Sequence, residues 1–310
     1  MREEIRIRHK QFLGIDPTHP PGQGNNKDTM GNDPRKLFQA SWRIGDIVSL
    51  MISANFKKLV HGSYIKFEYV DELHKSMRLD ILYKNVINEF LNETKDEIDD
   101  VYDPGLLWLT SPYYVKMYGY DIIPELNWDD EEYEGPNLEK RKYVVFAPLI
   151  DATYNLERNM SNQFINSMCL KLKEKFGDNF YVILDQENEK CINIKNINII
   201  ISDRIYDLGY IISNSKCFIG GDTGFSHLAG SSRIPQQICL GWNDQRMYNF
   251  NYTQWPWFFI NPFSLQGQFI NQTWDAFPQI DKRVTDYHEF ILENNSLTEE
   301  QINKLITLIK

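Results

Sequence analysis

The second half of the chain alternates short apolar runs with longer amphipathic stretches. Runs such as KYVVFAPL (142–149) are apolar almost throughout, which is typical of strands buried on both faces of a parallel sheet. The stretch 159–177 has helical spacing, with Ser161 as the expected N-cap and Gly177 as the expected stop. The pattern predicts strands at 142–149, 179–185, 197–201, 216–222 and 236–241, and helices at 159–177, 204–215 and 225–232. This alternation predicts an α/β protein with a doubly wound parallel sheet.

The first half shows a weaker version of the same pattern. Its clearest helix is 46–60, where Ile47, Leu50, Met51 and Ala54 share one face. We expect strands at 36–41, 64–70 and 105–111, and a short helical stretch near 71–79. The acidic stretch NETKDEIDDVYD (92–103) could bind a metal but is expected to be a solvated loop.

Composition changes suggest where the chain divides. Residues 14–35 are rich in Pro, Gly, Asn and Asp, and 127–142 combine acids, a Gly-Pro pair and basic residues. We predict an N-terminal arm or loop (1–35), an N-terminal domain (36–135) and a C-terminal domain (136–290). The last segment, 291–310, is expected to be a helix, with a cap formed by Ser296 and Glu299, that packs back on the N-terminal domain.

Composition and charge exclude several classes of protein. The chain has 310 residues, 42% of them hydrophobic, and a net charge of −10, so a nucleic-acid partner is not expected. The first 14 residues have no apolar stretch of the length expected of a signal peptide, and no apolar run reaches the roughly 18 residues that span a membrane. We therefore expect a cytoplasmic protein. Free, buried thiols are expected at all four cysteines: Cys169, Cys191, Cys217 and Cys239.

The turn in FIGGDTGFSHLAG (218–230) carries the most candidate chemistry. Gly221, Asp222, Thr223 and Gly224 lie between a predicted strand and a predicted helix, where N–H groups and the helix dipole can bind an anion. His227 lies about one turn into the helix, and Asp222 can accept hydrogen bonds from sugar hydroxyls. These groups suit a diphosphate beside a polyol. The alternative is a plainly capped helix with a half-buried histidine, and the spacing alone leaves both open.

A second turn, SWRIGDIVSL, places Gly45 and Asp46 at the start of the predicted helix 46–60. An aspartate there is usually a helix cap. It could also act as a general base that takes a proton from a hydroxyl as the oxygen attacks.

The two turns together resemble the heptosyltransferase family, glycosyltransferase family 9. Members have a Gly-Asp after the first strand, here Gly45-Asp46, and a late Asp-Thr-Gly-x-x-His-x-x-Ala signature, here residues 222–229. The resemblance covers 142–245 well, and the first half only near 37–60. It implies a GT-B fold, in which two Rossmann-like domains face a cleft.

The resemblance also implies a reaction. A sugar moves from a nucleotide diphosphate donor, ADP-heptose or another, to a hydroxyl of a glycan, lipid or protein, with inversion and without a metal or other cofactor. Asp46 would be the base, while Gly221, Asp222, Thr223, Gly224 and His227 would hold the donor. Arg158 is a candidate phosphate contact after the first strand of the second domain.

Three alternatives stay open. The same fold can host a nucleotide-sugar epimerase or hydrolase, or a module that binds a nucleotide or glycan without chemistry. The aromatic stretch 251–263, with Trp255 and Trp257, could pack in a core, stack on a sugar or contact a membrane surface. The acids of WDDEE (128–132) could bind a metal but are expected to be solvated.

Overall fold

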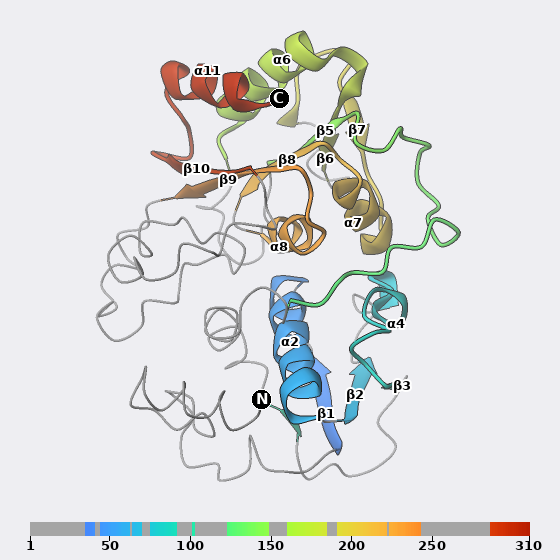
Figure 1. Cartoon of the computed structure of the whole chain (residues 1–310). Coiled ribbons are helices and arrows are strands. Elements are labelled where there is room, and N and C mark those ends of the chain that lie inside the picture. The colour runs from blue at the N-terminus through green and yellow to red at the C-terminus, as the bar shows by residue number, and fades with distance from the viewer. Residues whose placement is uncertain are drawn as a thin grey trace, which may run out of the picture. The chain divides into compact units, whose positions relative to one another are not determined.

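The computed structural model describes residues 35–40, 44–62, 64–69, 75–91, 101–102, 123–148, 160–184, 191–221, 223–242 and 286–310. The chain divides into two compact units, Met1–Trp128 and Asp129–Lys310 (Figure 1). The division falls ahead of the boundary expected at 135–136, because residues 129–134 are bonded to the second unit, as described below. The predicted arm, 1–35, lies outside the described residues except for Arg35, which begins a strand.

The first unit contains a parallel sheet of four strands in the order β3-β2-β1-β4. The strands are β1 (Arg35–Ala40), β2 (Tyr64–Tyr69), β3 (Glu89–Leu91) and β4 (Val101–Tyr102). The helices are α2 (Ile44–Phe56), the π-helical turn η1 (Lys57–His61) and α4 (Leu79–Leu82). Both α2 and β2 supply buried side chains, among them Ile47, Met51, Ile65 and Phe67.

Three details of this unit differ from the sequence analysis. The helix expected at 46–60 begins at Ile44, so Gly45 and Asp46 lie inside its first turn. The acidic stretch expected to be a loop includes β4, because Val101 and Tyr102 pair with β1. The strand predicted at 105–111 lies outside the described residues.

The second unit is built on a parallel sheet of six strands in the order β10-β9-β8-β5-β6-β7. These are β5 (Val144–Ala147), β6 (Phe180–Ile183), β7 (Asn198–Ile200), β8 (Cys217–Gly221), β9 (Gln236–Trp242) and β10 (Tyr287–Leu292). From β5, the chain adds β6 and β7 on one side, then β8, β9 and β10 on the other. The predicted doubly wound parallel sheet is therefore confirmed, and its order reverses between β5 and β8.

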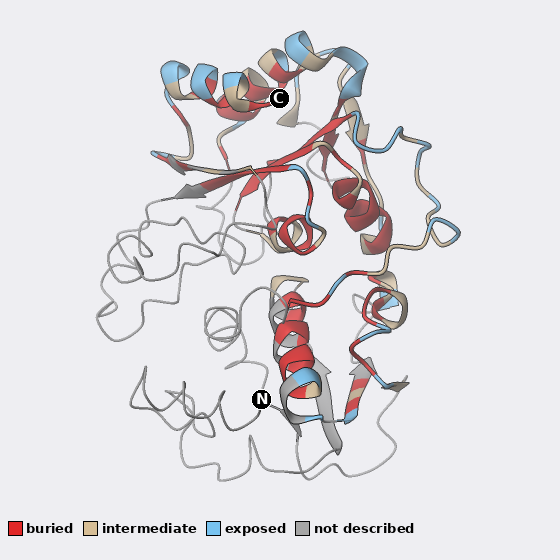
Figure 2. Ribbon diagram, viewed as in Figure 1, coloured by how far each residue is buried: buried red, intermediate tan, exposed pale blue. Residues whose placement is uncertain are grey.

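Helices cover both faces of this sheet (Figures 1 and 2). Val144 and Phe146 belong to a core that includes α6 (Asn162–Phe176) and α11 (Glu299–Leu308). Val145 and Ala147, which point to the opposite face, belong to a core with α7 (Ile205–Ser213) and α8 (Gly224–Ser231). The alternation along β5 is the two-residue period of a strand buried on both faces.

Helix caps agree with the sequence analysis at one helix and differ at another. Ser161 caps α6, because its side chain accepts a hydrogen bond from Phe164 N, and Gly177 follows the last residue of α6. The expected cap of the final helix by Ser296 and Glu299 is wrong. The capping box uses Thr298 and Gln301, since the backbone of Ser296 is already bonded to Glu293 in a turn.

The final helix packs within its own unit. Ile302, Leu305 and Ile309 lie in the core with α6, and Lys175 Nζ of α6 donates to the Ile306 and Ile309 carbonyls at 2.6 and 2.7 Å. We expected 291–310 to pack on the N-terminal domain. Its apolar face is instead buried against α6, the other helix on the same face of the sheet.

All four cysteines are free thiols, as predicted. Cys169, Cys217 and Cys239 are buried, whereas Cys191 is only half-buried. Burial raises the pKa of the Cys169 thiol to about 12. In the described part of the chain, no helix is long and apolar enough to cross a membrane.

Candidate functional site

The turn between β8 and α8 lies where the strand order of the larger sheet reverses. β8 ends at Gly221, and α8 begins at Gly224 with Thr223 as its N-cap residue. The adjacent strand is β5, paired in register with Ala147 opposite Gly220. In open parallel sheets, ligands bind outside the carboxyl ends of the strands at such a reversal. The strand order therefore puts the predicted motif at the expected place for a ligand.

Close packing at the end of β8 explains one of its glycines. A Cβ atom at Gly220 would lie 2.7 Å from Phe218 Cζ and 3.3 Å from the Ala147 carbonyl oxygen. The first distance is too short for two carbon atoms. Gly220 therefore lets the buried Phe218 ring lie against the strand while β8 stays paired with β5.

Thr223 is the most informative residue of the turn. Its backbone is extended, as an N-cap residue requires, but its side chain makes no capping hydrogen bond. Its Oγ1 atom is buried and has no hydrogen-bond partner among the described residues. A buried hydroxyl left unpaired costs roughly 1–3 kcal/mol. The hydroxyl is thus not used as a plain cap.

The first turn of α8 adds the positive end of a helix dipole. The N–H groups of Ser226 and His227 donate to the Thr223 carbonyl at 3.0 and 3.3 Å. Earlier N–H groups of a helix have no acceptor within it, so they can bind an anion. No acidic side chain lies in this first turn to compete for them. His227, the fourth residue of α8, is half-buried.

Two neighbouring side chains that the sequence analysis did not assign also shape this turn. The hydroxyl of the fully buried Ser226 donates to the Gly221 carbonyl, and Gln237 Nε2 of β9 donates to the Ser226 carbonyl at 2.9 Å. Ser226 lies inside the motif, so its position was visible in the sequence. Gln237 gave no sequence signal beyond a polar residue at a predicted strand.

The structure brings Gly221, Thr223, Gly224 and His227 together in this one turn. Asp222 and Arg158 lie outside the described residues. Asp46 belongs to the first turn of α2 in the other unit, after β1, and its side chain is likewise not described. As β5 does in its sheet, β1 lies between strands added on either side, β2 and β4.

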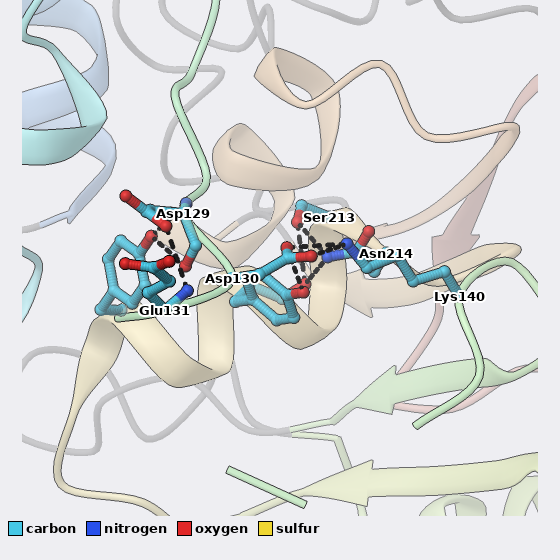
Figure 3. Close-up of polar contacts among 8 residues, drawn as sticks. Asp129, Asp130, Glu131, Lys140, Ser213 and Asn214 are labelled. Atoms are coloured by element: carbon cyan, nitrogen blue, oxygen red, sulfur yellow. Dashed lines mark hydrogen bonds and ion pairs between the residues drawn. The ribbon is translucent and has the colours of Figure 1, made fainter. Parts of the chain in front are cut away.

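The acids of WDDEE, residues 129–132, belong to a strap, residues 129–142, along α7 (Figure 3). Asp130 accepts hydrogen bonds from Lys140 Nζ at 2.7 Å and Tyr210 Oη at 2.6 Å, and these bonds lower the pKa of its carboxyl. Tyr206 Oη accepts from Asp129 N at 2.6 Å. Asp130 is exposed, as expected of a solvated acid, although Tyr210 of α7 also bonds its carboxylate. Tyr206 of α7 contacts Asp129 through the backbone of Asp129.

Tyr133 and Glu134 of the strap also contact α7 and Arg204, the N-cap residue of α7. Tyr133 stacks on Tyr210 with ring centroids 4.1 Å apart, and Glu134 N donates to the buried Asp207 at 3.2 Å. Arg204 forms an ion pair with Glu134. Among the residues that the structure describes, no group of three His, Cys, Asp or Glu side chains is placed to hold a metal ion.

No protein-family model matches the chain, and no curated protein matches it. Among solved structures, the chain is similar to a glycosyl transferase family 9 protein from Veillonella parvula DSM 2008. The TM-score is 0.51 at 10% identity, over 89% of this chain and 97% of that one. This likeness shows a shared α/β fold. It confirms the resemblance to family 9 transferases at the level of the fold.

Two further structures are similar to the chain. One is E. coli heptosyltransferase WaaC with ADP, with a TM-score of 0.48 and 11% identity over 88% of this chain and 97% of that one. The other is the iron-containing dodecameric glycosyltransferase TibC from enterotoxigenic E. coli, with a TM-score of 0.45 and 14% identity. That match covers 67% of this chain and 58% of TibC.

Proposed function

We propose that the protein is a glycosyltransferase that moves a sugar from a nucleotide diphosphate donor to an acceptor hydroxyl. The observation that carries the proposal is the buried Thr223 hydroxyl, at the N-terminus of α8 where the strand order reverses. It has no hydrogen-bond partner in the described part of the chain. An anionic ligand with further oxygen atoms suits that position. The fold shared with a family 9 transferase and the Asp-Thr-Gly-x-x-His-x-x-Ala signature support the same assignment.

In this proposal the second unit binds the donor. The diphosphate accepts hydrogen bonds from the first N–H groups of α8 and from the Thr223 hydroxyl. His227 adds positive charge when protonated, and Asp222 accepts from the sugar hydroxyls. Gly221 and Gly224 leave room for the backbone to approach, and Arg158 is a further phosphate contact. The helix dipole would stabilise the charge that develops on the leaving diphosphate.

The first unit supplies the base in this proposal. The acceptor oxygen attacks the anomeric carbon of the sugar and passes its proton to the Asp46 carboxylate. The bond between that carbon and the diphosphate oxygen breaks, and its electron pair leaves with the nucleotide. Attack opposite the leaving group inverts the anomeric centre. The two units would face each other in a GT-B arrangement, and no metal or cofactor takes part.

Donor binding can be tested by thermal unfolding with ADP-, GDP- and UDP-sugars. A ligand that binds only the folded state stabilises it by about 2.7 kcal/mol at 100 times its Kd. We expect one nucleotide class to raise the melting temperature. The sequence resemblance makes ADP-heptose the first donor to try. No shift with any of these donors would contradict the proposal.

The role of Asp46 can be tested with Asp46→Asn, which keeps the size of the side chain but removes its basicity. Transfer should fall at least 100-fold, the usual contribution of a general base, while donor affinity stays the same. Asp80→Asn is a control in the same unit, because the Asp80 carboxylate pairs with Arg78 at 3.2 Å. Near-full transfer by Asp46→Asn would remove the base assignment.

The same assays distinguish the other candidate functions. Release of a changed sugar without any acceptor would favour an epimerase or hydrolase. Donor binding without turnover over a wide range of acceptors would favour a binding module.

A further inference from the structure

A buried amide touches the candidate site from the neighbouring strand. Gln237 is fully buried in β9, and its register partner in β8 is the buried Phe218. Its Nε2 donates to the Ser226 carbonyl at 2.9 Å, whereas its Oε1 is buried without a partner among the described residues. An unpaired buried carbonyl costs roughly 1–3 kcal/mol. An apolar side chain would avoid that cost, but it would lose the bond to the Ser226 carbonyl.

Ser226, which Gln237 contacts, connects Gln237 to the turn between β8 and α8. Ser226 is fully buried, and its hydroxyl donates to the carbonyl of Gly221, the last residue of β8. Its N–H donates to the Thr223 carbonyl at 3.0 Å. Ser226 therefore bonds both the end of the strand and the N-cap of the helix. These bonds close the turn 221–226, which holds Thr223 and the first N–H groups of α8.

We propose that Ser226 and Gln237 are positioning residues that fix this turn for a nucleoside diphosphate. The proposal rests on the proposed function of the same site. Gln237 holds the first turn of α8 against β9, and Ser226 holds it against the end of β8. Together they set the direction of the Thr223 hydroxyl and of the first helical N–H groups. Neither residue touches the ligand.

The variants Ser226→Ala and Gln237→Met each remove one link with little change in shape. Ser231→Ala is the matched control: Ser231 is buried at the other end of α8, and its hydroxyl has no hydrogen-bond partner among the described residues. Two quantities are measured on the full chain. One is hydrogen exchange of the amides in 221–227 without ligand, and the other is calorimetric affinity for ADP, GDP and UDP.

We expect Ser226→Ala and Gln237→Met to speed amide exchange at 221–227. Each should also lower the affinity for the preferred nucleoside diphosphate roughly tenfold, or about 1.4 kcal/mol. The control should leave both quantities unchanged. The double variant should be weaker than either single one, because the two changes remove separate hydrogen bonds that hold the same turn. Ser226→Thr keeps the hydroxyl and should restore most of the affinity.

Each contrary result has a distinct meaning. Unchanged exchange in both variants overturns the positioning role, whatever the ligand does. Faster exchange with unchanged affinity reduces Ser226 and Gln237 to structural residues and likewise overturns it. If the wild-type protein binds none of the three diphosphates, the proposed function fails and the donor-positioning role fails with it. The exchange data then still show whether the two residues hold the turn.

Discussion

At the scale of single residues, the Thr223 hydroxyl does not make the stabilising bond that is usual at its position. Threonine is common at N-caps because its hydroxyl usually accepts a backbone hydrogen bond, and replacing it there usually costs about 1 kcal/mol. Here that bond is absent, and the hydroxyl is buried without a partner among the described residues. The Thr223 hydroxyl is therefore the group that the proposed function assigns to an anionic ligand.

Thr223→Val should reverse the usual effect of losing a cap residue. The free energy of unfolding should stay unchanged or rise by up to about 1 kcal/mol, because an unpaired hydroxyl leaves the interior. Donor affinity should fall roughly tenfold, since a hydrogen bond to a charged group is lost. Urea unfolding and calorimetry measure the two quantities, with Thr223→Ser as the control that keeps the hydroxyl. A clear loss of stability in the valine variant would show that the hydroxyl has a partner in the folded protein.

Asp286 shows how one carboxylate can join several elements. It accepts from Gln236 of β9 at 3.1 Å and forms ion pairs with His288 of β10 at 2.6 Å and with Lys310 at 2.7 Å. Burial alone would raise its pKa, but the hydrogen bond of Lys310 and the charges of His288 and Lys310 outweigh burial and lower it. The ionised form is therefore the one that the folded state favours.

This pKa shift predicts a pH dependence with a definite sign. A carboxyl whose pKa is lower in the folded state stabilises the protein above its unfolded pKa, about 3.9, and loses that contribution as the pH falls through the folded pKa. Asp286→Asn should therefore be less stable than the wild type near pH 7, with a difference that shrinks below about pH 4. Urea unfolding across this range measures it, and Asp203→Asn is the control at an exposed carboxylate. A difference independent of pH would contradict the assignment.

At the scale of elements, the final helix shows how a cap is selected. Both Ser296 and Thr298 are hydroxyl residues just before the helix, and sequence reasoning chose Ser296. In the structure, the Ser296 N–H and carbonyl pair with Glu293. Thr298 Oγ1 accepts from Gln301 N at 3.3 Å, and Gln301 Oε1 accepts from Thr298 N at 2.8 Å. The tertiary turn thus decides between two chemically equivalent candidates.

Thr298→Ala should lower the free energy of unfolding by about 1 kcal/mol, the usual cost of a lost N-cap. Ser296→Ala should cost less, because the Ser296 hydroxyl caps no helix and bonds the carbonyl of the adjacent Leu297 at 3.2 Å. Thr307→Ala serves as the control, because it removes an exposed hydroxyl from the last turn of the same helix, far from the cap. Chemical denaturation compares the three. A larger loss of stability in Ser296→Ala than in Thr298→Ala would support Ser296 as the N-cap, as the sequence suggested.

At the scale of the whole molecule, the strap 129–142 determines where the second unit begins. Sequence reasoning took these residues for a linker because they are polar and include a Gly-Pro pair. The structure bonds Asp129, Asp130 and Glu134 to α7, a helix more than 70 positions later in the chain. The unit therefore begins at Asp129 rather than near residue 136.

Two fragments can test this boundary. The fragment 129–310 should unfold cooperatively, whereas 136–310 should be less stable by roughly 1–3 kcal/mol or more, because the buried Asp207 loses the N–H of Glu134. Thermal and urea unfolding of both fragments measure the difference. Equal stabilities would place the boundary back near residue 136.

The sequence by itself determined the layers of the second unit and the position of its candidate turn. Strands buried on both faces need uninterrupted apolar runs, and helices need amphipathic spacing, so both leave a local pattern. The glycines and the helix start around Thr223 are local too. Only the tertiary structure decided that β8 lies beside β5, that Gln237 holds Ser226, that α11 packs on α6 and that the strap binds α7. Each of these depends on contacts between distant segments, for which the residues involved have no local preference that a sequence could reveal.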